Sequence, residues 1–183
     1  MTKASNIASI EKSTGKNWGE WLELLNGLDA KTLSHLELSK LVETKLHGVV
    51  DNPGWWAQSV TVAYEQAIGR RIPGQLANGL FELAVSKTVA KPREVLFFQA
   101  VEWFEGRSTL DGKEYTNPRQ TVTPKRSNWR CDFNDGSKFA VTVEESAREK
   151  SKLVLSHTDV PNPAEADHWR VYWAMTADML KEL

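Results

Sequence analysis

The stretch Asn52-Pro-Gly-Trp-Trp-Ala-Gln-Ser-Val-Thr-Val-Ala-Tyr-Glu-Gln-Ala-Ile-Gly-Arg-Arg-Ile-Pro-Gly-Gln75 divides the chain into two halves with different patterns. Up to about Ile68, apolar residues recur at three- and four-residue steps, which is typical of helices. After a connector from Pro73 to Gly79, the apolar period becomes two, which is typical of strands. We therefore predict an α+β protein with a small helical domain over residues 1–76 and a second domain over residues 77–183.

Composition limits the classes of partner. The net charge of −1 provides no overall electrostatic attraction to nucleic acid or to an anionic membrane, so a partner must be recognised locally. Cys131 is the only cysteine, which excludes an internal disulfide and agrees with a reducing compartment. No apolar run approaches the roughly 18 residues of a membrane span, and residues 1–10 lack a signal-peptide pattern. We expect a cytoplasmic protein that does not associate with membranes.

Three helices are predicted in the first half. The first begins after Asn17 and ends at Asn26-Gly27, where glycine breaks the apolar pattern. The second begins at the capping box Ser34-His-Leu-Glu37 and ends near Gly48, where a left-handed residue is favoured. The third begins at Asn52-Pro53, an N-cap and first-turn pair.

The third helix carries more apolar surface than a three-helix unit needs. Beside the inner stripe of Trp56 and Val60, a neighbouring stripe contains Trp55 and Val62. This surplus indicates a docking surface. We expect Trp55 and Val62 to pack against the second domain or a second subunit.

The second half predicts a strand, a helix, an antiparallel meander and a closing helix. Phe81 and Val85 alternate with polar or small residues in the first strand, and Pro92 is expected at the first position of the helix that follows. Residues 106–118 are predicted to be loop with at most one edge strand. The meander is predicted at residues 119–123, 128–133, 137–145 and 151–157, and the closing helix at residues 162–183.

Several motifs in this half carry a resemblance. Leu83-Ala-Val-Ser-Lys-Thr-Val-Ala-Lys-Pro-Arg-Glu-Val-Leu-Phe, Lys152-Leu-Val-Leu-Ser-His-Thr-Asp-Val-Pro and Ala164-Glu-Ala-Asp-His-Trp-Arg-Val-Tyr-Trp resemble the chaperone-ATPase-activator branch of the START and Bet v 1-like superfamily (SRPBCC). The resemblance covers residues 79–183 and implies a helix-grip fold, in which a curved antiparallel sheet grips a long C-terminal helix. The middle of this chain is shorter than in that family, so the expected grip is trimmed and its cavity smaller.

The first half resembles a bacterial helical domain of unknown function. The matching segments are Thr14-Gly-Lys-Asn-Trp-Gly-Glu-Trp and Trp55-Trp-Ala-Gln-Ser-Val-Thr-Val-Ala-Tyr-Glu-Gln-Ala-Ile-Gly-Arg. A family without an assigned activity transfers none.

Two functional interpretations follow from the helix-grip expectation. In the first, which the sequence favours, the grip encloses an apolar pocket for a small hydrophobic or amphipathic ligand. Its expected lining is Phe81, Val85, Phe98, Trp129, Phe139, Val141, Leu155, His157, Trp169, Tyr172 and Trp173. In the second, tryptophans fill the cavity and the protein binds a protein partner, with chaperone-related binding implied by the resemblance. A cyclase- or hydrolase-type enzyme on the same fold is a third, less favoured alternative.

The remaining constellations do not favour catalysis, cofactors or nucleic acid. No two histidines have metal-ligand spacing and no glycine-rich phosphate loop is present, so no metal or cofactor is expected. Ser156, His157 and Asp159 lie on one strand and diverge, so they cannot form a triad by themselves. His157 faces either a ligand or, in the simpler interpretation, solvent or backbone. The basic cluster Arg119, Lys125, Arg126 and Arg130 beside Trp129 is better explained as a solvated hairpin than as a nucleic-acid surface.

Overall fold

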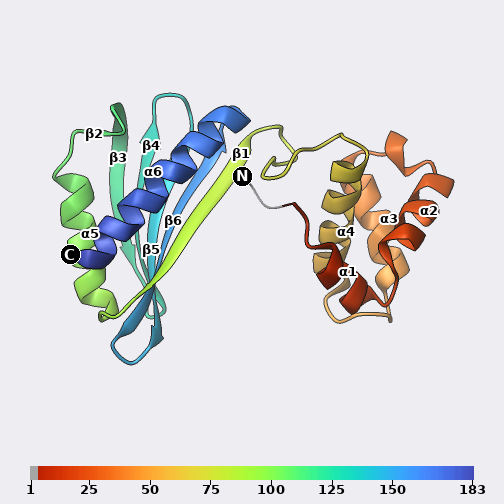
Figure 1. Cartoon of the computed structure of the whole chain (residues 1–183), viewed down its shortest axis with the longest axis horizontal. Helices are drawn as coiled ribbons and strands as arrows, with labels where there is room; N and C mark the ends of the chain where they lie inside the picture. Colours follow the sequence, from red (N-terminus) through yellow and green to blue (C-terminus); the bar gives the residue numbers. More distant parts are fainter. Residues whose placement is uncertain (1–3) are drawn as a thin grey trace. The chain divides into compact units, whose positions relative to one another are not determined.

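The computed structural model describes residues 4–183, which form two units (Figure 1). One unit extends to Ala77, and the other runs from Asn78 to Leu183. Each unit contains a hydrophobic core of its own. In the described part of the chain, no helix is long and apolar enough to cross a bilayer.

The regular secondary-structure elements in the described part of the N-terminal unit are helices. Its elements are α1 (Ile7–Thr14), α2 (Trp18–Gly27), the 3-10 helix η1 (Ala30–Thr32), α3 (His35–Leu46) and α4 (Pro53–Ala67). Their apolar sides meet in one core around Trp21, Leu25, Val42, Val60 and Tyr64. Apolar burial of this kind supplies most of the stability of such short helices, which are marginal in isolation.

Helix α1 and the short helix η1 are not among the predicted elements. The apolar side of α1 consists of Ile7 and Ile10 only, which is too few residues for a clear helical period. Asn6 caps it by accepting a hydrogen bond from the Ser9 amide at 3.1 Å. The indole of Trp21 donates to Thr14 Oγ1 at 3.1 Å, so the end of α1 is held by a contact with α2.

The predicted helix starts are confirmed at α2, α3 and α4, with one difference in detail. Ser34 and Glu37 form the expected capping box, in which each side chain accepts from the other residue's backbone N–H. Asn52 stands at the N-cap of α4, but its φ of 58° is left-handed and its side chain makes no capping bond. Asparagine tolerates this conformation better than most residues, which fits the turn before Pro53.

The C-terminal unit is a curled antiparallel sheet with two helices (Figure 1). In the part of the chain that the structure describes, the strand order is β1-β6-β5-β4-β3-β2. The strands are β1 (Phe81–Val89), β2 (Thr109–Leu110), β3 (Lys113–Val122), β4 (Arg126–Phe133), β5 (Lys138–Ala147) and β6 (Lys150–Val160). Helix α6 (Pro163–Glu182) lies across the sheet, and α5 (Arg93–Glu105) packs in the same core. The predicted α+β class, with an antiparallel sheet gripping the C-terminal helix, is confirmed.

Two local predictions in this unit are wrong. The segment predicted to be loop with at most one edge strand contains the short strand β2 and the first residues of β3, which extends into the strand predicted at residues 119–123. The residues of β3 from Thr116 to Val122 are all exposed. An exposed edge strand buries neither face, so it lacks the apolar alternation that marks other strands. Pro92 is the N-cap of α5 rather than its first residue. Its ψ of 149° is extended, so the helix begins one residue later.

Candidate functional site

The strand register brings the predicted site residues of the sheet into two rows. Val85 pairs with Leu155, Leu155 with Val141, and Val141 with Trp129. In the next row, Phe139 lies opposite His157. Side chains of paired residues point to the same face of a sheet, so both rows face one side.

Helix α6 places its aromatic residues on these rows. The Trp173 ring stacks on Phe139 with a centroid separation of 3.8 Å and an interplanar angle of 12°. Trp169 stacks on Trp173 at 5.1 Å, also at 12°. From α5, Phe104 stacks on Trp129 at 5.1 Å. We call the space between the two rows and α6 the grip interior.

Most of the predicted ligand-site residues come together, and they fill the grip interior. Eight of them are buried: Phe81, Trp129, Phe139, Val141, Leu155, His157, Trp169 and Trp173. Val85 and Tyr172 are half-buried against the same core. The stacked rings are in van der Waals contact at the centre of the grip, where a ligand would have to lie.

Phe98 is the exception, because 62 % of it is exposed to solvent. Helix α5 turns Leu96, Phe97, Ala100 and Phe104 inward instead. Its sequence is apolar around most of the helix, so the period alone could not show which side faces the core. The prediction that Phe98 lines the grip is wrong.

His157 is buried inside the grip and fully hydrogen-bonded. Its Nδ1 accepts from the Trp173 indole at 3.2 Å, and an indole N–H can only donate. The proton of the neutral ring therefore sits on Nε2, which donates to Ser137 Oγ at 2.9 Å. Burial lowers the pKa of His157 to about 4, so the ring is neutral at pH 7. His157 is satisfied by side chains, not by solvent or backbone.

The hydrogen-bond chain continues to the surface through three charged residues. Ser137 Oγ donates to Asp135 Oδ1 at 2.6 Å, and Lys113 Nζ bonds Asp135 at 2.8 Å and Glu165 at 3.0 Å. Although burial opposes ionisation, the bonds from Lys113 and Ser137 lower the pKa of Asp135 to about 2. The Ser137 hydroxyl donates its proton to the Asp135 carboxylate, and its oxygen accepts a hydrogen bond from Nε2 of His157. This arrangement is the reverse of a nucleophile activated by a histidine base.

An open groove lies on the same unit, between α5 and β3. Its volume is about 510 Å³. We call it the α5–β3 groove, and its lining is Arg93, Glu94, Phe97, Phe98, Val101, Glu102, Glu105, Gln120, Val122 and Ser127. Except for Phe98, none of these residues was predicted to line a site. Two features of the sequence could have indicated the groove: apolar residues on several sides of α5, and a valine at the end of β3 that has no place in the core.

Hydrogen bonds between α5 and the β3–β4 region hold the groove at both ends. The Arg93 guanidinium donates to the Thr123 and Pro124 carbonyls at 3.1 and 2.8 Å, which ties the start of α5 to the β3–β4 turn. At the other end, Glu105 Oε1 accepts from Gln120 Nε2 at 3.1 Å and from the Trp129 indole at 3.0 Å. The separation of α5 from β3 is therefore set by side chains that are themselves bonded.

Two of the four cations in the basic cluster of β3 and β4 are paired with carboxylates. Arg119 bonds both oxygens of Asp132 at 3.0 Å, and Arg126 lies 3.4 Å from Glu144. Trp129 is buried and cannot stack on a base. The ring that would have to stack beside these cations is therefore inside the core.

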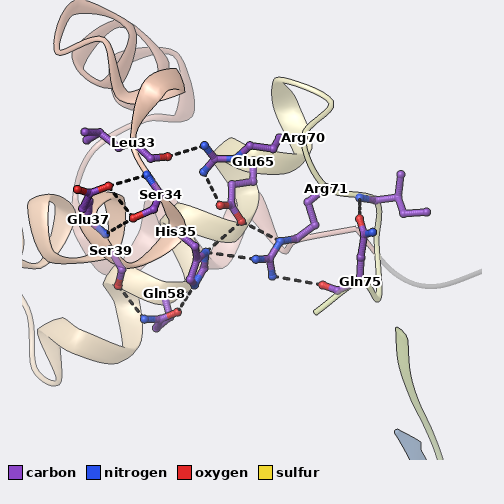
Figure 2. Close-up of polar contacts among 11 residues, drawn as sticks. Leu33, Ser34, His35, Glu37, Ser39, Gln58, Glu65, Arg70, Arg71 and Gln75 are labelled. Atoms are coloured by element: carbon purple, nitrogen blue, oxygen red, sulfur yellow. Dashed lines mark hydrogen bonds and ion pairs between the residues drawn. The ribbon is translucent and has the colours of Figure 1, made fainter. Parts of the chain in front are cut away.

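The N-terminal unit contains a second polar cluster, centred on Glu65 (Figure 2). Glu65 is only 2 % exposed, yet both its oxygens are paired. Arg70 bonds Oε1 at 2.5 Å, and Arg71 Nε lies 2.8 Å from Oε2. Arg70 also donates to the Leu33 carbonyl at 2.6 Å. The two arginines that follow α4 therefore compensate a buried carboxylate.

His35 completes this cluster at the start of α3 (Figure 2). Its Nδ1 lies 3.1 Å from Glu65 Oε2, and its Nε2 lies 2.8 Å from Gln58 Oε1. The Gln58 amide donates in turn to Ser39 Oγ at 2.7 Å. These bonds clamp the first half of α3 to α4, at Gln58 and at Glu65. Since every member has a partner inside the cluster, we interpret it as structural.

The docking stripe predicted on the third helix is open to solvent. Trp55 is 63 % exposed and meets Trp56 edge to face at 4.5 Å. Together with Val62, Ile10 and neighbouring polar residues, these rings line a hollow of about 330 Å³ within the N-terminal unit. The packing of Trp55 and Val62 against another domain or subunit stays a prediction.

Comparisons with known proteins place the chain only by remote structural similarity. No protein-family model and no curated protein sequence matches it. Among solved structures it is similar to an uncharacterised protein from Bacillus thuringiensis (10 % identity, TM-score 0.37, 55 % of this chain and 96 % of the other). It is also similar to an HSP90 activator from Plasmodium falciparum (19 %, 0.31, 46 % and 76 %) and to a protein of unknown function from Enterococcus faecalis (13 %, 0.41, 65 % and 80 %). Similarities at this level assign no function.

Proposed function

We propose that the C-terminal unit is a non-catalytic protein-interaction module whose core is filled by its own aromatic side chains. The observation that carries this proposal is the stack of Trp173 on Phe139 at 3.8 Å in the centre of the grip. A small apolar ligand would have to separate these rings before it could bind there. Loss of the packing of one buried tryptophan costs roughly 3–5 kcal/mol, which a small ligand would first have to offset.

The hydrogen bonding of the grip also favours this function over catalysis. Interior polar groups serve enzymes when they converge on a space that substrate can enter. Here Ser137 and His157 bond each other and are both buried. Their donors and acceptors are bonded within the protein. This supports a structural role for the series of hydrogen bonds that links Trp173, through His157, to Lys113.

The form of the proposal that names a chaperone rests on the sequence motifs that resemble chaperone-ATPase activators. It predicts that the protein binds a bacterial Hsp90-type chaperone and changes its rate of ATP hydrolysis saturably. If neither binding nor a rate change is seen, the chaperone form is discarded. The module would then serve a different protein partner.

A titration with a fluorescent apolar probe tests the filled core directly. We expect 1-anilinonaphthalene-8-sulfonate to show no saturable binding that depends on Trp173. Trp173→Phe keeps a large ring in the core, and Phe98→Asp removes apolar surface from the groove without touching the grip. Saturable binding that survives Phe98→Asp but changes at least tenfold with Trp173→Phe would reject the filled core and support a ligand-binding protein.

A further inference from the structure

We propose that the α5–β3 groove binds an extended, basic segment of the partner protein, which adds a strand to the free edge of β3. This inference rests on the proposed function, because it names the surface and the chemistry of that interaction. Three independent features of the groove support it: an unpaired strand edge, exposed apolar side chains and an excess of carboxylates.

The first feature is the backbone edge. Strand β3 pairs with β4 on one side, but on the other side β2 pairs only through Thr109 with Glu114 and Leu110 with Lys113. In the described residues no strand covers the rest of that edge. The register of β3 with β4 is regular from Arg119 to Val122, so this segment offers a template of backbone donors and acceptors.

The other half of β3 is blocked, which limits where an added strand can pair. A register irregularity lies between Thr116 and Arg119, Asn117 has a left-handed φ of 52°, and Pro118 lacks a backbone N–H. Natural edge strands carry such features where pairing is prevented. They are absent from residues 119–122, beside the groove.

The second feature is the apolar surface. Phe98 is 62 % exposed and Val122 is 64 % exposed, and both line the same hollow. Phe97 and Val101 extend this surface along α5. An added strand presents alternate side chains to one face, so every second residue of the segment would meet this surface. We therefore expect apolar residues at alternate positions of the bound segment.

The third feature is charge. Glu94, Glu102 and Glu105 line the groove, against Arg93 as its one cation. The Arg93 guanidinium is already bonded to Glu94 and to two carbonyls, whereas no hydrogen bond or ion pair joins the Glu102 carboxylate to a described residue. A lysine or arginine of the segment would complement this excess of negative charge. A small amphipathic cation would match the charge and the apolar floor, but it would leave the strand edge unpaired.

Selection from a displayed library of random 12-residue peptides on the full-length protein provides the first test. We expect the selected peptides to alternate apolar and basic residues. Phe98→Ala and Val122→Ala should each weaken their binding at least tenfold, and Glu102→Gln several-fold with a smaller dependence on salt. The matched controls are Val171→Ala, on the exposed side of α6, and Glu82→Gln, on β1 at the opposite end of the sheet order. Both controls should leave binding unchanged.

Backbone methylation of the best selected peptide tests the added strand. A strand alternates its N–H groups between its two edges, so N-methyl groups can be placed on one edge at a time. Methylation of the edge that faces β3 should abolish binding, and methylation of the other edge should leave it within about threefold. Equal effects from both edges would overturn strand addition.

Other results separate this inference from the function on which it rests. The groove is rejected if no selected peptide distinguishes the parent protein from the Phe98→Ala and Val122→Ala variants, or if acidic peptides bind as well as basic ones. It is also rejected if the anilinonaphthalene probe occupies the groove and selected peptides do not compete with it. None of these results restores ligand binding in the grip, which would instead require the Trp173-dependent probe binding described above.

Discussion

The grip interior and the α5–β3 groove are both formed by the same sheet and by aromatic residues of α5, but only the grip interior is closed to solvent. In the interior, Trp173 and Phe139 are buried and stacked, and the polar atoms of His157 are satisfied. In the groove, Phe98 and Val122 are exposed, and the Glu102 carboxylate pairs with no cation of residues 4–183. An exposed surface with apolar side chains and an unpaired carboxylate can gain free energy when a partner covers it. A filled core offers a partner no such gain.

The N-terminal unit repeats the contrast between closed and open regions. Glu65 is buried and its two oxygens are paired, while Trp55 stands in an open hollow on the same helix. In both units the difference predicts opposite responses to mutation. Substitutions in the closed regions should lower stability, and substitutions in the open regions should leave stability nearly unchanged.

The largest effect is expected from Trp173→Ala. Removal of a ring that contacts both Phe139 and Trp169 leaves a cavity in a packed core, which costs roughly 3–5 kcal/mol of unfolding free energy. Urea denaturation measures this cost, with Val171→Ala on the exposed side of the same helix as control, expected within about 0.5 kcal/mol. A loss below about 1 kcal/mol would mean that the grip interior is not tightly filled.

The second effect concerns the charged cluster of the N-terminal unit. Glu65→Gln leaves Arg71, which is mostly buried, without its carboxylate, and breaking a buried ion pair costs about 3 kcal/mol. Glu23→Gln changes an exposed carboxylate of α2 and should cost less than about 0.5 kcal/mol. Urea denaturation with far-ultraviolet circular dichroism follows both variants. Equal stability of the two would show that the Glu65 cluster does not clamp α3 to α4.

The closed regions differ in how far the sequence could predict them. Alternation in β4 and β5 and the stripe of α6 predicted that Trp129, Phe139 and Trp173 face one another, and the structure confirms it. These positions follow from local periodicity, which a single sequence contains. Whether the rings line a cavity or fill it depends on their packing in space, and the sequence left both alternatives open.

The Glu65 cluster and the groove depend on contacts that have no local signal. His35 and Glu65 are 30 residues apart, and Glu65 reads as an ordinary charged residue of an amphipathic helix. Phe98 follows Phe97 on α5, a helix with apolar residues on several sides, so no period assigns it to either side of the helix. Strand β3 is exposed, which removes the alternation that predicted β4 and β5. The sequence therefore predicts the buried layers better than the surfaces available to a partner.

A smaller effect is expected from pH, through His157. Its pKa is about 4 in the folded protein and 6.5 in the unfolded chain, so between these values only the unfolded state takes up the proton. Stability from this residue is therefore complete above pH 6.5 and falls as the pH decreases towards 4. Each pH unit lowers the unfolding free energy by at most about 1.4 kcal/mol, which gives a loss of about 2 kcal/mol at pH 5.

Urea denaturation from pH 7.5 to 4.5 measures this slope. His157→Gln should have a lower unfolding free energy than the parent protein at pH 7.5. Its unfolding free energy should also fall less steeply as the pH decreases, because the contribution of His157 is gone. His168→Gln is the matched control, because His168 is exposed and pairs with Asp111 at the surface. If the slope persists in His157→Gln and disappears in His168→Gln, the neutral buried state of His157 is refuted.

The smallest effect on stability is expected at Phe98, and it separates the open region most sharply from the closed one. With 62 % of the side chain in solvent, Phe98→Ala removes little buried area and should change the unfolding free energy by less than about 0.5 kcal/mol. Its buried neighbour provides the matched comparison, because Phe97→Ala on the same helix should cost roughly 3 kcal/mol. Thermal and urea unfolding of the two variants test the pair. A loss above about 1.5 kcal/mol for Phe98→Ala would show that the groove is part of the core, and the contrast between the filled grip and an available groove would fail.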